Sequence, residues 1–143
     1  WYHPRAEHDL WVCHGPPYRR PGGKGSTVTS VSKPLVDHRV YTITLRKMPE
    51  FLRVFNELAM PVLLQTLGHP IGFYTSLVGP QNQFIHLWGY DDLADYERRC
   101  LARDSHPDFP AYLAASGHLI TAQETRLVRA APMPGWGSPA PVL

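Results

Sequence analysis

The segment 82–90, Asn-Gln-Phe-Ile-His-Leu-Trp-Gly-Tyr, holds the residues whose types and spacing best suit chemistry. If it is a strand, its alternate positions share one face, namely Phe84, His86, Trp88 and Tyr90. A histidine can accept or donate a proton near neutral pH, and aromatic rings with polar tips suit the wall of a cavity. We therefore predict a ligand-binding face here, with His86 as the candidate catalytic residue.

The same strand also has a structural interpretation. No acid or nucleophile close in the sequence completes a triad with His86, so this residue can equally be a fixed hydrogen-bonding group. Trp88 and Tyr90 can stack on a flat ligand, or they can fill the core of a dimer. The sequence leaves both interpretations open.

Further candidate ligand-binding residues come from the neighbouring strands. They are polar or aromatic, and they share a phase that would let them reach the same cavity: Thr42, Thr44, Arg46, Tyr74 and Glu124, together with Arg126. A shift of one residue in strand register would turn all of them to the opposite face. Because charges near strand ends commonly pair, an ion pair of Glu124 with Arg46 or Arg126 is the structural alternative.

Hydrophobic periodicity predicts the elements that must position these side chains. Strands are expected at 40–46, 71–78, 82–90 and 119–129. One helix should run from Pro49 to a left-handed cap at Gly68, with a kink at Pro61. A second should be capped by Asp92, and a short third should cover 109–116. The order β-α-β-β-α-β, with a split second crossover, is typical of an α+β, ferredoxin-like fold with a four-stranded antiparallel sheet and helices on one face.

Length and composition are those of an ordinary globular protein of 143 residues. Residues 1–36 and 132–143 are rich in proline and glycine, so we expect an irregular extension, one domain over 37–131 and a disordered tail. The longest apolar run, 58–64, is too short to cross a bilayer, and no membrane span is expected. The net charge of −1 over 37–143 argues against binding of nucleic acid.

Metal and cofactor chemistry is not predicted. The histidines show neither an i, i+4 spacing nor a carboxylate placed as in helix-borne metal motifs, and no glycine-rich phosphate loop follows a strand. Cys13 and Cys100 are too few for a disulfide framework, which favours a reducing compartment. We expect the cytoplasm, or mitochondria if the source is a eukaryote.

Residues 38–130 resemble the NIPSNAP family. The resemblance is carried by the segments Val40-Tyr41-Thr42, Met48-Pro49-Glu50-Phe51-Leu52 and Asn82-Gln83 before His86-Leu87-Trp88, and by Gly68, Gly72, Gly79, Leu93, Arg98 and Gln123-Glu124. It implies a dimeric α/β barrel, in which two sheets face each other around a cavity, and hence a homodimer. We expect Ile85 and Leu87 to face the helices, so that the aromatic residues of their strand lie on the uncovered face and are buried by the second copy.

Two functions follow from these patterns. The leading prediction is a NIPSNAP-type homodimer that binds a small, partly apolar molecule or acts as an interaction module, with no catalytic step assigned. The alternative, which rests on fold analogy, is a cofactor-independent monooxygenase or isomerase for an aromatic or polyketide-like substrate. In that case His86 would move a proton, Trp88 and Tyr90 would hold the rings, and Arg46 would stabilise an enolate oxygen.

Overall fold

The first strand, β1 (Leu35–Ile43), is rich in the β-branched and aromatic residues that favour a pleated surface. It begins and ends earlier than the alternation over 40–46 predicts, so Thr44 and Arg46 lie in the connection that follows it. The computed structural model describes residues 33–131. The predicted extension up to residue 32 and the predicted tail over 132–143 lie outside this range.

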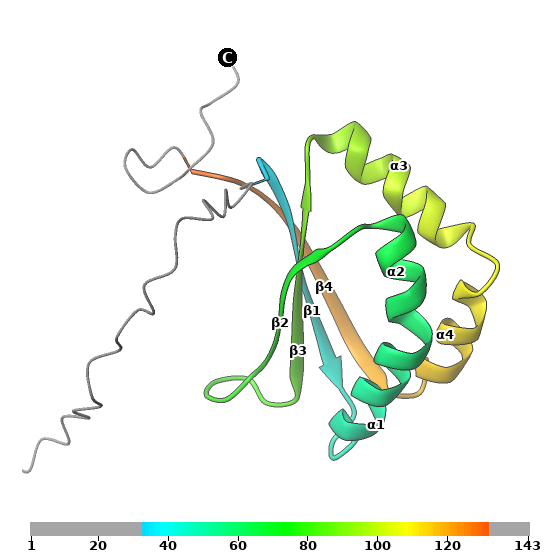
Figure 1. Ribbon diagram of the computed structural model, residues 1–143. Helices are drawn as coiled ribbons and strands as arrows, with labels where there is room; N and C mark the ends of the chain where they lie inside the picture. Colours follow the sequence, from blue (N-terminus) through cyan, green and yellow to red (C-terminus); the bar gives the residue numbers. More distant parts are fainter. Residues whose placement is uncertain (1–32, 132–143) are drawn as a thin grey trace, which may run out of the picture.

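Four antiparallel strands form one sheet in the order β2-β3-β1-β4 (Figure 1). β2 (Pro70–Thr75) and β3 (Gln83–Tyr90) form the predicted hairpin, and β4 (Ile120–Arg129) pairs with the other side of β1. Tyr41 of β1 lies opposite Phe84 of β3 and Gln123 of β4. Because directly opposed residues share a face, this register decides which side chains point toward the helices.

Three helical segments fill the first crossover, where the sequence predicts one kinked helix. They are α1 (Met48–Val54), the wider π-helical turn η1 (Phe55–Ala59) and α2 (Met60–Thr66). In η1 the amide of Met60 donates to the carbonyl of Phe55, five residues back. The wide turn immediately precedes Pro61, which has no amide hydrogen to donate. The predicted irregularity is thus confirmed, and it takes the form of a π turn.

Gly68 ends α2 with a left-handed backbone, at a φ of 86°, as predicted. Its amide donates to the carbonyl of Leu63 at 3.1 Å. Arg99 reaches this end from a later helix and donates to the carbonyl of Leu67 at 2.7 Å. A side chain at position 68 would meet this guanidinium, since an added Cβ lies 3.2 Å from Arg99 Nη1.

The second crossover contains α3 (Leu93–Asp104) and α4 (Phe109–Ser116), which confirms its predicted split. Asp92 caps α3, because its carboxylate accepts from the amide of Asp95 at 2.8 Å. All helices lie on the same face of the sheet (Figure 1). No helix within residues 33–131 is long and apolar enough to cross a membrane.

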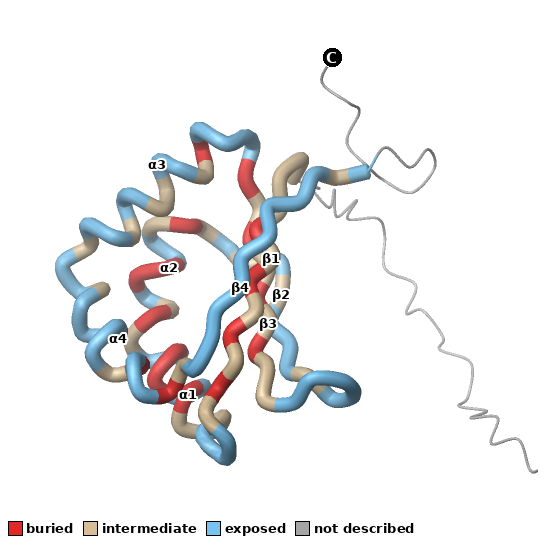
Figure 2. Tube along the Cα trace, turned by 180° about the vertical axis from the view of Figure 1, so that it is seen from behind, coloured by how far each residue is buried: buried red, intermediate tan, exposed pale blue. Residues whose placement is uncertain are grey.

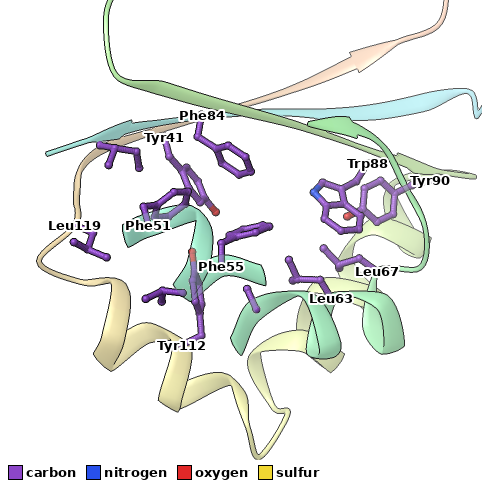
Figure 3. Packing of buried hydrophobic residues seen from close by; sticks show 13 residues of the cluster. Tyr41, Phe51, Phe55, Leu63, Leu67, Phe84, Trp88, Tyr90, Tyr112 and Leu119 are labelled. Carbon is purple, nitrogen blue, oxygen red and sulfur yellow. The ribbon is translucent and has the colours of Figure 1, made fainter. Parts of the chain in front are cut away.

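The core lies between the helices and one face of the sheet (Figure 3). Phe51 and Phe55 from the first crossover pack edge to face on Phe84, with ring centroids 5.2 and 5.0 Å apart. His86, Trp88 and Tyr90 of the same strand are also fully or almost fully buried there.

The prediction that the aromatic strip of β3 faces away from the helices is therefore wrong. Phe84, His86, Trp88 and Tyr90 lie under the helices, and the alternate residues Ile85 and Leu87 occupy the other face. The physical reason is that the first crossover places phenylalanine rings over this face of the sheet. Aromatic side chains of β3 pack against these rings better than aliphatic side chains would.

The other face of the sheet, here called the open face, has no helix from residues 33–131 over it (Figure 2). Its apolar side chains are Val36, Val40, Ile85 and Leu87, with Tyr74 and Val128 toward the two edges. His38 lies between the two valines of β1, and Glu124 and Arg126 lie beside them on β4. Tyr74 is 54% exposed and Val128 45% exposed. Both faces of the sheet therefore carry apolar side chains, and residues 33–131 cover one of them.

Candidate functional site

A cavity of about 260 Å³ lies between the sheet and the helices. The sheet contributes polar side chains to its wall, from Arg39, Tyr41, His86 and Gln123. The helices contribute mainly apolar ones, from Phe55, Leu63, Leu67, Phe109 and Leu113. Gln123 is exposed and Leu113 is 53% exposed, so the cavity reaches the surface between β4 and α4.

His86 is the most deeply buried polar residue of this wall, at 1% exposure. The indole nitrogen of Trp88 donates to its Nδ1 at 2.8 Å. Because an indole N–H can only donate, Nδ1 is the acceptor, and in the neutral ring the proton resides on Nε2. Nε2 has no hydrogen-bond partner within residues 33–131. The ring thus presents one unused donor.

Aromatic rings surround this imidazole. It stacks on Phe84 with centroids 5.3 Å apart, and Tyr41 and Phe55 approach edge to face at 4.7 and 5.6 Å. Burial, together with the positive charges of Arg39 and Arg103, lowers the pKa of His86 to about 3. His86 is therefore a neutral N–H donor at physiological pH and holds no second proton.

Arg39 is the second polar group of the sheet wall and is 8% exposed. Its Nε donates to Oδ2 of the fully buried Asp37 at 2.6 Å. Burial opposes the charge of Arg39, but the neighbouring carboxylate outweighs burial and raises the pKa of the guanidinium. Asp37 does not line the cavity, so Arg39 brings its charge to the wall while its carboxylate partner lies away from it.

Two tyrosine hydroxyls approach from opposite walls. In Figure 3 the oxygens of Tyr41, on β1, and Tyr112, on α4, point toward one another across the interior. The Tyr112 hydroxyl has no hydrogen-bond partner within the described residues. Burial raises the pKa of Tyr112, so its hydroxyl stays protonated and can donate or accept.

The connection between α3 and α4 borders the cavity. Arg103 at the end of α3 lies over the ring of Phe109 at the start of α4, 5.5 Å from its centroid. Its Nε donates to Asp104 at 2.8 Å. The Arg103 side chain is 14% exposed, whereas that of Asp104 is 53% exposed. A cation therefore lies inside the cavity rim, and its carboxylate partner lies in solvent.

Comparison with known proteins identifies the fold seen here. The NIPSNAP family model matches residues 36–134. The chain belongs to the NIPSNAP family. Among curated proteins, none matches it.

Solved structures of NIPSNAP proteins share this fold. One from Agrobacterium tumefaciens is 30% identical, covers 68% of this chain and 93% of its own, and has a TM-score of 0.66. A NIPSNAP-like domain protein from Burkholderia xenovorans is 29% identical over 75% of this chain and 90% of its own, also at 0.66. Another A. tumefaciens NIPSNAP protein, described as of unknown function, is 23% identical over 71% and 91%, at 0.66, and shows the fold alone.

Within this NIPSNAP domain the predicted site residues separate into three groups. Phe84, His86, Trp88 and Tyr90 lie on the helix side, and of these His86 alone lines the cavity. Thr42, Tyr74 and Glu124 lie on the open face, so the prediction that they share a cavity with His86 is wrong. Thr44 and Arg46 follow the end of β1.

The structural alternative for two of these charges is confirmed. Nε of Arg126 donates to Oε1 of Glu124 at 2.6 Å, an ion pair between residues on one face of β4. Arg46, which the sequence offered as the other partner of Glu124, is exposed and has a φ of 66° in the loop after β1. It lies outside both the cavity lining and this ion pair.

Several cavity residues of the NIPSNAP domain were not predicted. They are Arg39, Tyr41, Arg103, Tyr112 and Gln123. One signal was available, because Asp37, Arg39 and Tyr41 alternate on β1 in the same phase as the apolar Ile43. A charged pair alone would ordinarily indicate the exposed side, and it marks a polar group inside the core only once the burial of Ile43 is known. No cluster of three or more potential metal ligands occurs in the part of the chain that the structure describes.

Proposed function

We propose that this NIPSNAP protein binds a small, partly apolar molecule in the cavity between its sheet and its helices. The observation that carries the proposal is the unused Nε2 donor of His86, buried at the wall of a cavity of about 260 Å³. A buried donor left without a partner costs about 1–3 kcal/mol, which a ligand acceptor would recover. The sequence predicted a ligand between the sheets of two subunits. The proposed site lies instead on the opposite face of the sheet, under the helices of one subunit.

The division of the wall supports the same proposal. Ligand pockets are mostly apolar with a few placed polar groups, and their volumes are typically about 300–1,000 Å³. The cavity here is slightly smaller and has a mainly apolar helix side, with Arg103 and Tyr112 as polar groups, opposite a polar sheet side. It therefore suits a small molecule with one oxygen-bearing edge and one apolar body.

The geometry supports binding better than proton transfer by His86. A general base needs a free ring nitrogen, but Nδ1 is occupied by the bond from Trp88, and Nε2 carries the ring proton. Its low pKa also leaves it without an acidic proton to give. In the alternative function, an oxygenase or isomerase, His86 would stabilise a developing negative charge by donating a hydrogen bond.

Blocking the cavity mouth tests the binding proposal. The variant Leu113→Trp adds a large ring at an exposed lining position, and Leu101→Trp adds the same ring at an exposed position of α3 outside the lining. We expect native mass spectrometry to detect small molecules retained by the wild type and by Leu101→Trp, and to find them lost from Leu113→Trp. Equal retention by all three proteins, or by none, would contradict the proposal.

We also propose that the protein is a homodimer whose subunits meet through the open face. This face has Val40 and Ile85 at its centre and leaves Tyr74 and Val128 about half exposed. The apolar side chains of β1 and β3 lie beside His38 and the Glu124–Arg126 ion pair on this face, and a two-fold pairing of identical faces is the commonest way to bury such apolar surface. The predicted dimer is retained, with aliphatic residues replacing the aromatic strip at its centre.

A charge at the centre of the open face tests the dimer. Ile85→Lys places an ammonium group beside Val40, whereas Leu101→Lys places one on the exposed surface of α3. Sedimentation velocity should show a dimer for the wild type and Leu101→Lys, and a monomer for Ile85→Lys. A wild-type monomer, or an Ile85→Lys protein that still dimerises, would contradict this interface.

A further inference from the structure

We propose that the molecule bound in this cavity is an aromatic organic anion, a carboxylate or phenolate, whose charged oxygen accepts from His86 Nε2 and lies near Arg39 and Arg103. This inference rests on the proposed function, that the cavity holds a small molecule. It specifies which class of molecule that is.

In the interior of the cavity, the wall has more hydrogen-bond donors than acceptors. Arg39 and Arg103 bring two guanidinium groups, and His86 brings an N–H that has no partner among the described residues. Asp104, which also lines the cavity, is more than half exposed and therefore lies at the rim in contact with water. Asp37 lies outside the lining, where it accepts from one nitrogen of Arg39. Among residues 33–131, none that lines the interior of the cavity consequently carries a negative charge to oppose a bound anion.

Geometry also directs the anion to the sheet side of the cavity. The helix side is apolar, through Phe55, Leu63 and Leu67, and offers an aromatic body a surface on which to pack. Hydrogen bonds to an ionised acceptor are about twice as strong as neutral ones, so the charged oxygen gains most beside His86 and the guanidinium groups.

The electrostatics of His86 agree with this placement. Positive charge from Arg39 and Arg103 helps to keep the imidazole from becoming a cation. A potential that disfavours an added positive charge at this point favours a negative one there, by the same Coulomb interaction. The two guanidinium groups would therefore lower the pKa of a weak acid bound against Nε2, in opposition to burial, which raises it.

Equilibrium dialysis with two matched probes on the full chain tests the inference. The probes are 1-naphthoate, a two-ring carboxylate, and 1-naphthamide, its uncharged analogue with the same rings. We expect the wild type to bind the carboxylate more tightly by on the order of tenfold. Arg103→Gln should remove most of this preference and retain binding of the amide, which shows that the cavity is intact. The control Arg98→Gln removes an exposed cation from the same helix, outside the lining, and should keep the preference.

The outcomes separate this inference from the proposed function. If both probes bind with equal affinity, or the amide binds more tightly, the anion class is refuted and the cavity remains a ligand site. If the preference survives in Arg103→Gln or disappears equally in Arg98→Gln, the assignment of the charge to the cavity wall is wrong. If neither probe binds, the proposed function fails and this inference fails with it.

Discussion

The protein should lose stability in mild acid because of one residue, His86. In the unfolded chain its imidazole titrates at an ordinary pKa of 6.5, whereas in the folded protein burial lowers the pKa to about 3. Between these values the unfolded chain binds a proton that the folded protein does not bind. The free energy of unfolding therefore falls as the pH falls from about 6.5 toward about 3, and it recovers as the pH rises again.

The size of this effect follows from the shift. Each pKa unit corresponds to about 1.36 kcal/mol, so the full contribution of His86 is about 4–5 kcal/mol. At about pH 4.5, some two units below the ordinary pKa, the loss relative to about pH 7 is roughly 2–3 kcal/mol. Since small domains are typically stable by about 5–15 kcal/mol, such a loss is large enough to measure by denaturation.

Urea denaturation across this pH range is the assay, at fixed protein concentration because association would change the apparent stability. The control is His86→Gln, whose amide can still accept from Trp88 and still donate into the cavity but does not titrate. The carboxylates that titrate in the same range remain in both proteins, so the difference between the two pH profiles isolates the imidazole. Parallel profiles from about pH 7 to about pH 4.5 would refute a buried, neutral His86.

Three further substitutions test the surroundings of the site. Trp88→Phe removes the donor to Nδ1 of His86, so nitrogen NMR should show the ring proton no longer confined to Nε2; an unchanged tautomer would contradict the bond. Gly68→Ala should lower the free energy of unfolding by about 1–2 kcal/mol, because the left-handed backbone resists a Cβ and Arg99 lies close to it; a neutral effect would argue against this cap. Leu63→Ala should cost about 2–5 kcal/mol by enlarging the cavity, and a loss below 1 kcal/mol would show that the helices collapse onto the sheet.

The order of the elements was predictable because each depends on local signals. The cap at Asp92, the left-handed glycine at 68 and the proline at 61 all mark the positions that the structure confirms. Each acts within one or two turns of chain, through an amide that it satisfies, a φ that it permits or a donor that it lacks. The family resemblance rests on the same residues spread over the domain.

The two faces of the sheet were not predictable from alternation. Both phases of β3 are apolar, Phe84 and Trp88 in one and Ile85 and Leu87 in the other, so hydrophobicity does not choose between them. The neighbouring strand obscures the choice further, because its buried phase contains the ion pair of Asp37 and Arg39. A charged pair would ordinarily indicate the exposed side, yet here it lies in the core.

The cavity could not be predicted from the sequence either, because the two faces of the sheet were assigned the wrong way round. Its wall combines Arg39 of β1, His86 of β3, Arg103 of α3, Tyr112 of α4 and Gln123 of β4, which only the crossovers bring together. Sequence spacing relates residues within one element, so it identified His86 and the aromatic residues of its strand. It could not identify the guanidinium groups of Arg39 and Arg103, which come from other elements. The donor character of the site depends on those groups. Burial and two nearby cations keep the imidazole neutral, and this property, on which the proposed binding role rests, emerges only from the tertiary arrangement.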